Sequence, residues 1–180
     1  MTVLWKELLK IGYHLFGNLR QNCGHYKGKR MLNEDYKEIL QILLDNEVKF
    51  LVVGAYAMGA YGYPRATGDF DIWVEASEEN SKKIYKSLAV FGAPLSGITE
   101  NTFAEKEIVF QIGVAPRRID FITHIDGVDF KTACDTKEEI EIENIKIPFL
   151  SKENLIKNKE STGREKDKLD VKYLKNNQKV

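Results

Sequence analysis

A short alternating run places the strongest constraint on what this chain can fold into. Residues 69–74 read Asp-Phe-Asp-Ile-Trp-Val, so that apolar side chains alternate with acidic or large ones. This period of two predicts a half-buried strand on which Asp69 and Asp71 project from the same face. Two carboxylates held so close repel each other unless a cation lies between them, and hard divalent ions such as Mg²⁺ bind oxygen ligands. The run therefore predicts a strand with a candidate metal site on one face.

A third acid stands in a second alternating run, Arg118-Ile119-Asp120-Phe121, where the carboxylate projects opposite to its apolar neighbours. A strand at this position, next to the first one, brings Asp120 to the other pair. Three carboxylates complete a site for one or two metal ions. Such a site suits phosphoryl or nucleotidyl transfer.

The remaining patterns predict an α/β (α+β) fold, a small mixed sheet with helices before, between and after its strands. Further strand patterns occupy 48–53, 108–114 and 139–149. Small residues alternate with tyrosine and methionine over 54–62, which favours a short, closely packed helix.

Three residues typical of helix N-caps each precede a longer helical pattern: Asn33, Ser77 and Ser151. Gly163 separates two C-terminal helices within 151–176. We expect residues 31–180 to form a single domain. Residues 1–30 are basic and rich in glycine towards their end, and are interpreted as an appendage of uncertain structure.

The composition excludes several classes of protein. The chain has 180 residues, 43% of them hydrophobic and 30% charged, which is typical of one soluble domain. No apolar run is long enough to span a bilayer, and the first residues lack the layout of a secretion signal. The two cysteines lie far apart, so a reducing cytoplasm is the expected location. A net charge of zero argues against a long duplex nucleic acid as partner, and no membrane partner is expected.

In their order along the chain, these elements resemble the signature of the polymerase-beta-type nucleotidyltransferase superfamily. The resemblance rests on Gly54-Ala55, then on 64–71, which reads Pro-Arg-x-Thr-x-Asp-x-Asp, and then on Asp120 as the third acid. The tail 155–170, with its Lys-x-x-x-Gly-Arg-x-Lys-Asp-x-x-Asp core, resembles one branch of small stand-alone enzymes. That branch includes the toxins of abortive-infection-type toxin–antitoxin systems.

The resemblance implies a fold, a reaction and a set of site residues. Mg²⁺ or Mn²⁺ is held by Asp69, Asp71 and Asp120, which are also the catalytic residues. A nucleoside monophosphate moves from an NTP such as ATP to an unknown acceptor hydroxyl on a small molecule, a protein or an RNA end. An antitoxin-like protein is a further partner that this branch implies. The residues expected to bind nucleotide or phosphate are Gly54, Ala55, Arg65, Thr67, Lys159 and Arg164, with Asp167 orienting Lys159 or Arg164.

Several alternatives remain open at this stage. Ala55 replaces the usual second glycine or serine of the signature, which favours a non-catalytic module that binds a nucleotide or a partner protein. Gly54 is equally consistent with tight helix–sheet packing, and Lys159 and Asp167 with solvated surface charges. Trp73 suits packing better than stacking on a base.

Overall fold

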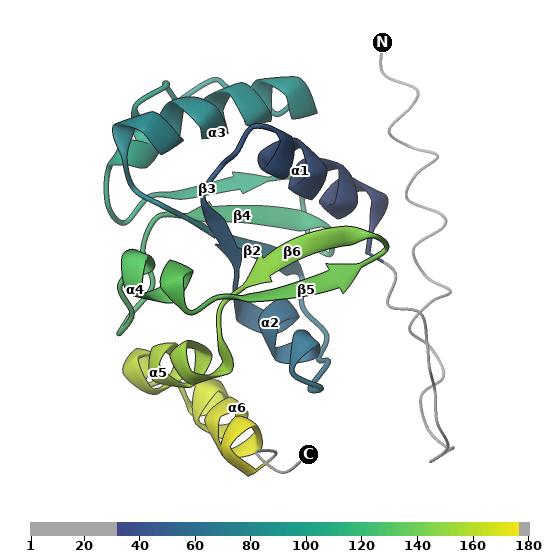
Figure 1. Cartoon of the computed structure of the whole chain (residues 1–180), viewed down its shortest axis with the longest axis vertical. Helices are drawn as coiled ribbons and strands as arrows, with labels where there is room; N and C mark the ends of the chain where they lie inside the picture. The colour runs from purple at the N-terminus through teal and green to yellow at the C-terminus, as the bar shows by residue number, and fades with distance from the viewer. Residues whose placement is uncertain (1–31, 177–180) are drawn as a thin grey trace.

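In the computed structural model, residues 32–176 form a six-stranded mixed sheet with helices on both faces (Figure 1). The strands are β1 (Phe50–Val52), β2 (Asp69–Val74), β3 (Val109–Ile112), β4 (Arg118–Ile122), β5 (Glu138–Ile142) and β6 (Ile145–Phe149). The helices are α1 (Glu34–Asp45), α2 (Gly54–Ala60), α3 (Glu78–Phe91), α4 (Phe130–Asp135), α5 (Lys152–Thr162) and α6 (Glu165–Asn176), with a 3₁₀ turn at Thr102–Ala104. The structure does not describe residues 1–31 and 177–180, so the interpretation of 1–30 as an appendage lies outside it.

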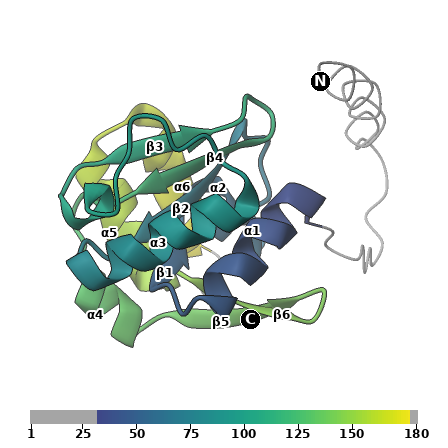
Figure 2. The ribbon, with the colours of Figure 1, turned by 90° about the horizontal axis from the view of Figure 1, so that it is seen from above.

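The two faces of the sheet carry different helices. Helices α1 and α3 lie side by side on one face, and α4, α5 and α6 lie on the other (Figures 1 and 2). Alternation along β2 sends its side chains to both layers. Phe70 stacks on Tyr36 of α1 with ring centroids 4.7 Å apart, whereas Trp73 meets Phe130 of α4 edge to face at 4.9 Å. The odd-numbered residues of β2, the acids among them, therefore face the α4–α6 layer.

The strand order is β3-β4-β2-β1-β6-β5, which makes β2 and β4 neighbours although α3 and β3 separate them in the chain. They pair in parallel, and the register sets Asp71 directly beside Asp120. Strand β3 pairs with β4 antiparallel and places Gln111 opposite Asp120 from the outer side. The crossover through α3 thus brings the two acidic runs onto adjacent strands.

The predicted helix ends agree with the structure. Asn33, Ser77 and Ser151 each accept a backbone N–H from the first turn of α1, α3 and α5. Such caps satisfy N–H groups that have no partner inside the helix. Gly92 and Gly163 end α3 and α5 in the left-handed conformation, with φ of +80° and +66°.

Some element bounds differ from the predicted ones. The 108–114 run yields only the four residues of β3, because Gly113 has a φ of +78° and begins the turn that contains the cis Ala115–Pro116 bond. Val53, expected at the end of a strand, is instead the N-cap of α2. Residues 93–106, which have no regular pattern, include the buried Phe103.

Among the described residues, no helix combines the length and apolar character needed to cross a membrane.

Candidate active site

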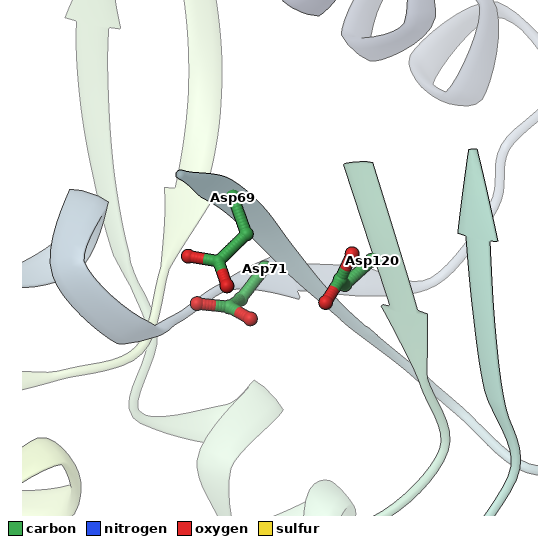
Figure 3. A group of neighbouring side chains, drawn as sticks. All are labelled: Asp69, Asp71 and Asp120. Atoms are coloured by element: carbon green, nitrogen blue, oxygen red, sulfur yellow. The ribbon is translucent and has the colours of Figure 1, made fainter. Parts of the chain in front are cut away.

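Three carboxyl groups converge on the α4–α6 face of the sheet (Figure 3). Asp69 and Asp71 project together from β2, and Asp120 projects towards them from β4. One oxygen from each lies within 4.8 Å of the others. Asp120 is buried, whereas Asp69 and Asp71 are partly exposed. The group is therefore accessible to solvent at Asp69 and Asp71.

Asp71 is packed against the start of α2. Gly54 has a φ of +63°, and a Cβ at that position would overlap the carboxyl group of Asp71. A glycine therefore both adopts the left-handed backbone and leaves room for the acid. Burial, followed by the negative charges of Asp69 and Asp120, raises the pKa of Asp71 to about 6. The ionised form of this acid is costly unless a cation is added.

Arg118 is the cation nearest to the acids. Its Nη2 donates to Oδ2 of Asp69 at 2.8 Å and to Oδ2 of Asp120 at 2.9 Å, and its Nε donates to Oδ1 of Asp120 at 2.7 Å. The guanidinium thus bridges β2 and β4 with charge-assisted hydrogen bonds.

Two neutral side chains complete the surroundings of the acids. Gln111 donates its amide to Oδ2 of Asp120 at 3.0 Å, across the β3–β4 pair. The hydroxyl of Thr67 donates to Oδ1 of Asp69 at 2.5 Å. Thr67, which the resemblance assigns to nucleotide binding, therefore holds an acid in this structure.

A second charged group lies behind the acids, between α5, α6 and the loop before β2. Nζ of Lys159 lies 2.8 Å from both Oδ1 of Asp167 and Oδ2 of Asp170, and Arg65 approaches Asp170 at 3.5 Å. Burial acts to raise the pKa of Asp167, but hydrogen bonds from Lys159 and Thr162 outweigh it and hold the pKa below its usual value. Lys159 and Asp167 are 5% and 3% exposed, so their interpretation as solvated surface charges is wrong.

This charged group is coupled to the acids through Asp71. The positive charge of Lys159 acts to lower the pKa of Asp71, against the effects of burial and of the other two acids. Arg164 is exposed at the turn between α5 and α6, and its charge reaches Asp167. Of the residues expected to bind phosphate, Arg65 and Lys159 therefore lie with the buried group, and Arg164 lies at its rim.

The structure also decides between packing and base stacking for Trp73. Trp73 is 1% exposed and packs against Phe130, so packing is the correct interpretation. Ala55 is buried with 6% exposure in the first turn of α2, and its methyl group contributes to the core. The N-cap residue of α2, Val53, offers no side-chain acceptor to the first N–H groups of this helix.

The sequence patterns did not indicate Arg118 and Gln111 as residues of the site. A signal was available for Arg118, since it stands two residues before Asp120 and so shares its strand face. No comparable signal existed for Gln111, because its position depends on the β3–β4 register.

The sequence itself matches no protein-family model and no curated protein. Its structure is similar to that of a Thermotoga maritima protein assigned as a nucleotidyltransferase, with a TM-score of 0.53 and 21% identity over 84% of this chain and 99% of that one. It is also similar to the lincosamide antibiotic adenylyltransferase LnuA with lincomycin bound, with a TM-score of 0.51 and 18% identity over 81% and 97% of the two chains.

These likenesses show the class of fold. The chain has the nucleotidyltransferase fold, as its resemblance to that superfamily predicts.

The donor set fits a hard divalent ion. All three ligand groups are carboxylates, the type that Mg²⁺ and Mn²⁺ prefer. With Arg118 counted, the group carries two negative charges when all acids are ionised, which one divalent ion neutralises. Oxygens bound to one Mg²⁺ at about 2.1 Å lie no more than about 4.2 Å apart, so small rotations of these side chains would close the site around an ion.

Proposed function

We propose that this protein is a metal-dependent nucleotidyltransferase that moves a nucleoside monophosphate from an NTP to an acceptor hydroxyl. One observation carries the proposal: Asp69, Asp71 and Asp120 converge on adjacent strands of a nucleotidyltransferase fold. The raised pKa of Asp71 supports it, because an acid that is costly to ionise is typical of functional sites.

In this reaction the acceptor oxygen forms a bond to the α-phosphorus of the NTP. The bond between the α-phosphorus and the oxygen that bridges it to the β-phosphorus breaks, and pyrophosphate leaves. Asp69 and Asp71 would bind the ion that meets the triphosphate. Asp120 would also bind metal and would help to deprotonate the acceptor hydroxyl. A bound divalent ion supplies the positive charge that the triphosphate and the leaving pyrophosphate require. The rest of catalysis is positioning and electrostatics, which the strand-borne acids provide.

We propose the following division of the remaining site residues. The backbone N–H groups of Gly54 and Ala55 meet phosphate at the uncapped start of α2. Arg164 supplies exposed positive charge. Arg65 adds a partly buried charge beside Asp170, and Thr67 turns between Asp69 and a nucleotide oxygen. Lys159 is committed to Asp167 and Asp170, so we place its action behind the site, where its charge favours the ionised form of Asp71.

We propose that the acceptor is a molecule that carries a hydroxyl group. The similarity to LnuA, an adenylyltransferase that acts on lincosamide antibiotics, supports a small molecule. A protein or an RNA end is the alternative acceptor. The tail motif supports the toxin branch, which implies an antitoxin-like protein as a partner. A cytoplasmic location and a single domain over 31–180 remain part of the proposal.

Pyrophosphate release tests the proposal. Purified protein is incubated with each NTP, Mg²⁺ or Mn²⁺ and a cell extract as the source of acceptor. We expect release that EDTA abolishes and that falls at least a hundredfold in Asp69→Asn and Asp120→Asn, since each removes a charge aimed at the transition state. Asp135→Asn, at an exposed position on α4, is the matched control. Undiminished release in the two site variants, with folding unchanged, would refute the assignment.

A non-catalytic module that binds nucleotide is the second candidate, favoured by Ala55. It predicts that NTP with metal raises the melting temperature while no pyrophosphate appears. Ala55→Ser restores the residue type of the signature. Release that appears only in this variant would favour the binding module.

A further inference from the structure

The acid group contains a positive charge that belongs to the chain itself. Arg118 donates to three of the four carboxylate oxygens of Asp69 and Asp120, and Thr67 donates to the fourth. Gln111 adds a second donor on Oδ2 of Asp120. Every oxygen of these two acids therefore accepts a hydrogen bond within the chain.

A divalent ion bound to the same acids would meet this guanidinium at short range. Nη2 of Arg118 is 2.8 Å from Oδ2 of Asp69 and 2.9 Å from Oδ2 of Asp120. An ion at about 2.1 Å from either oxygen would lie within about 5 Å of Nη2. Like charges at that separation repel, and the repulsion is strong where Asp120 is buried. The ion and the guanidinium compete for the same two acids.

Arg118 also has a route out of the group. The side chains of Arg118 and Asp69 are 30% and 32% exposed, whereas that of Asp120 is only 8% exposed. Rotation of the arginine towards solvent, or towards phosphate arriving from solvent, needs no movement of the strands. The fork of the guanidinium suits phosphate as well as carboxylate.

We propose that Arg118 is a built-in counter-ion, a positioning residue that holds Asp69 and Asp120 together before metal binds and that the metal displaces. This inference rests on the proposed function, since it concerns the same metal site. It makes metal affinity in this protein the outcome of an exchange between two cations.

Metal binding without turnover tests the exchange. Mn²⁺ affinity is measured by calorimetry at pH 8 for the wild type, Arg118→Met and Arg117→Met. Arg117 is exposed and adjacent. Its variant removes the same charge but leaves the guanidinium of Arg118 and its hydrogen bonds in place. We expect Arg118→Met to bind Mn²⁺ about fivefold or more tightly, the scale of one partly exposed ion pair. Its melting temperature in EDTA should fall by several degrees, because Asp69 and Asp120 lose their counter-ion. Arg117→Met should change neither value.

Mn²⁺ affinity in Arg118→Met that equals or falls below the wild-type value would overturn the inference and leave the metal site standing. Absence of Mn²⁺ binding in all three proteins would overturn the proposed function as well. The wild type provides a second readout that needs no loss of the side chain. Its Arg118 Nε–Hε resonance, assigned by its loss in Arg118→Lys, should shift when Mg²⁺ saturates the protein. An unshifted resonance at saturation would also overturn the inference.

Discussion

Asp71 is the residue at which stability and the proposed chemistry conflict. It packs against Gly54 and faces two other acids, and these surroundings raise its pKa to about 6. The folded protein thus holds a proton on this carboxyl more tightly than the unfolded chain, whose aspartates titrate near 3.9. Stability from this source is fully present below about pH 4 and is lost as the pH rises through 6.

Asp71→Asn should therefore stabilise the protein at high pH. We expect a gain on the order of 2 kcal/mol in the free energy of unfolding at pH 8 in EDTA, discounted for the partial exposure of the side chain, and little change at pH 4. Urea denaturation at the two pH values measures it, with Asp135→Asn as control. A loss of stability at pH 8 would show that the acid is not strained by its neighbours.

Gly54 and Gly59, both in α2, form a matched pair for substitution by alanine. Gly54→Ala puts a methyl group into the Asp71 carboxyl and strains a backbone with φ of +63°, so we expect a loss of about 2 kcal/mol or more in unfolding free energy. A Cβ at Gly59 would lie 3.8 Å from its nearest neighbour, Cα of Pro64. Gly59→Ala should be neutral or stabilise by up to about 1 kcal/mol. Equal effects of both substitutions, measured by chemical denaturation, would contradict this account.

Among the elements, α5 and α6 share a buried group of charged side chains. Asp167, Asp170 and Leu174 are buried on α6, whereas Leu169 is 68% exposed. Lys159 of α5 pairs with both acids. The helix pair therefore depends on a buried cation whose neighbours are carboxylates.

Lys159→Met should be strongly destabilising, because it leaves two buried carboxylates without their partner. We expect a loss of about 3 kcal/mol or more in unfolding free energy, the usual cost of breaking a buried ion pair. Lys168→Met removes only a surface pair with Glu165, and its effect should stay below about 0.5 kcal/mol. A loss under 1 kcal/mol for Lys159→Met would show that the buried group is not a structural element.

The loss of Lys159 should also affect the pKa of Asp71. Its charge acts to lower the pKa of Asp71, so that pKa should rise in a folded Lys159 variant. Lys159→Gln, which retains hydrogen-bonding capacity, suits this measurement. The pH at which Mn²⁺ binding is half-maximal should move upward relative to the wild type, and an unchanged midpoint would contradict the coupling.

Local patterns predicted most elements because caps and periodicity are local signals. Asn33, Ser77 and Ser151 begin helices as expected, and the alternation of 69–74 is a strand. Hydrophobic periodicity does not register ion pairs, so the burial of Asp167 and Asp170 on α6 was not predicted. Arg118 was missed for the same reason, although it shares a strand face with Asp120 and donates to it.

At the scale of the whole molecule, sequence order and spatial order differ. Strands β2 and β4 are neighbours only because the chain crosses over through α3 and β3. No local pattern sets the register of Asp71 beside Asp120. The convergence of the acids was predicted from their chemistry and from the superfamily resemblance, and the strand pairing supplies its physical cause.

Ligand binding should be visible in the stability of the whole protein. An NTP with Mn²⁺ at about one hundred times its Kd adds about 2.7 kcal/mol to the unfolding free energy. For a domain of this size that corresponds to a rise of about 5–10 °C in melting temperature. The rise should vanish with EDTA and in Asp120→Asn. A rise that persists in both would locate nucleotide binding away from the acids.

The position of a bound ion tests the central claim most directly. Crystals grown with Mn²⁺ and a non-hydrolysable NTP analogue, measured at a wavelength where manganese scatters anomalously, reveal where the ion lies. The account predicts an anomalous peak within about 2.2 Å of carboxylate oxygens of Asp69, Asp71 and Asp120, in line with ordinary metal–oxygen distances. A well-ordered analogue with manganese bound elsewhere, or with none beside these three acids, would contradict it.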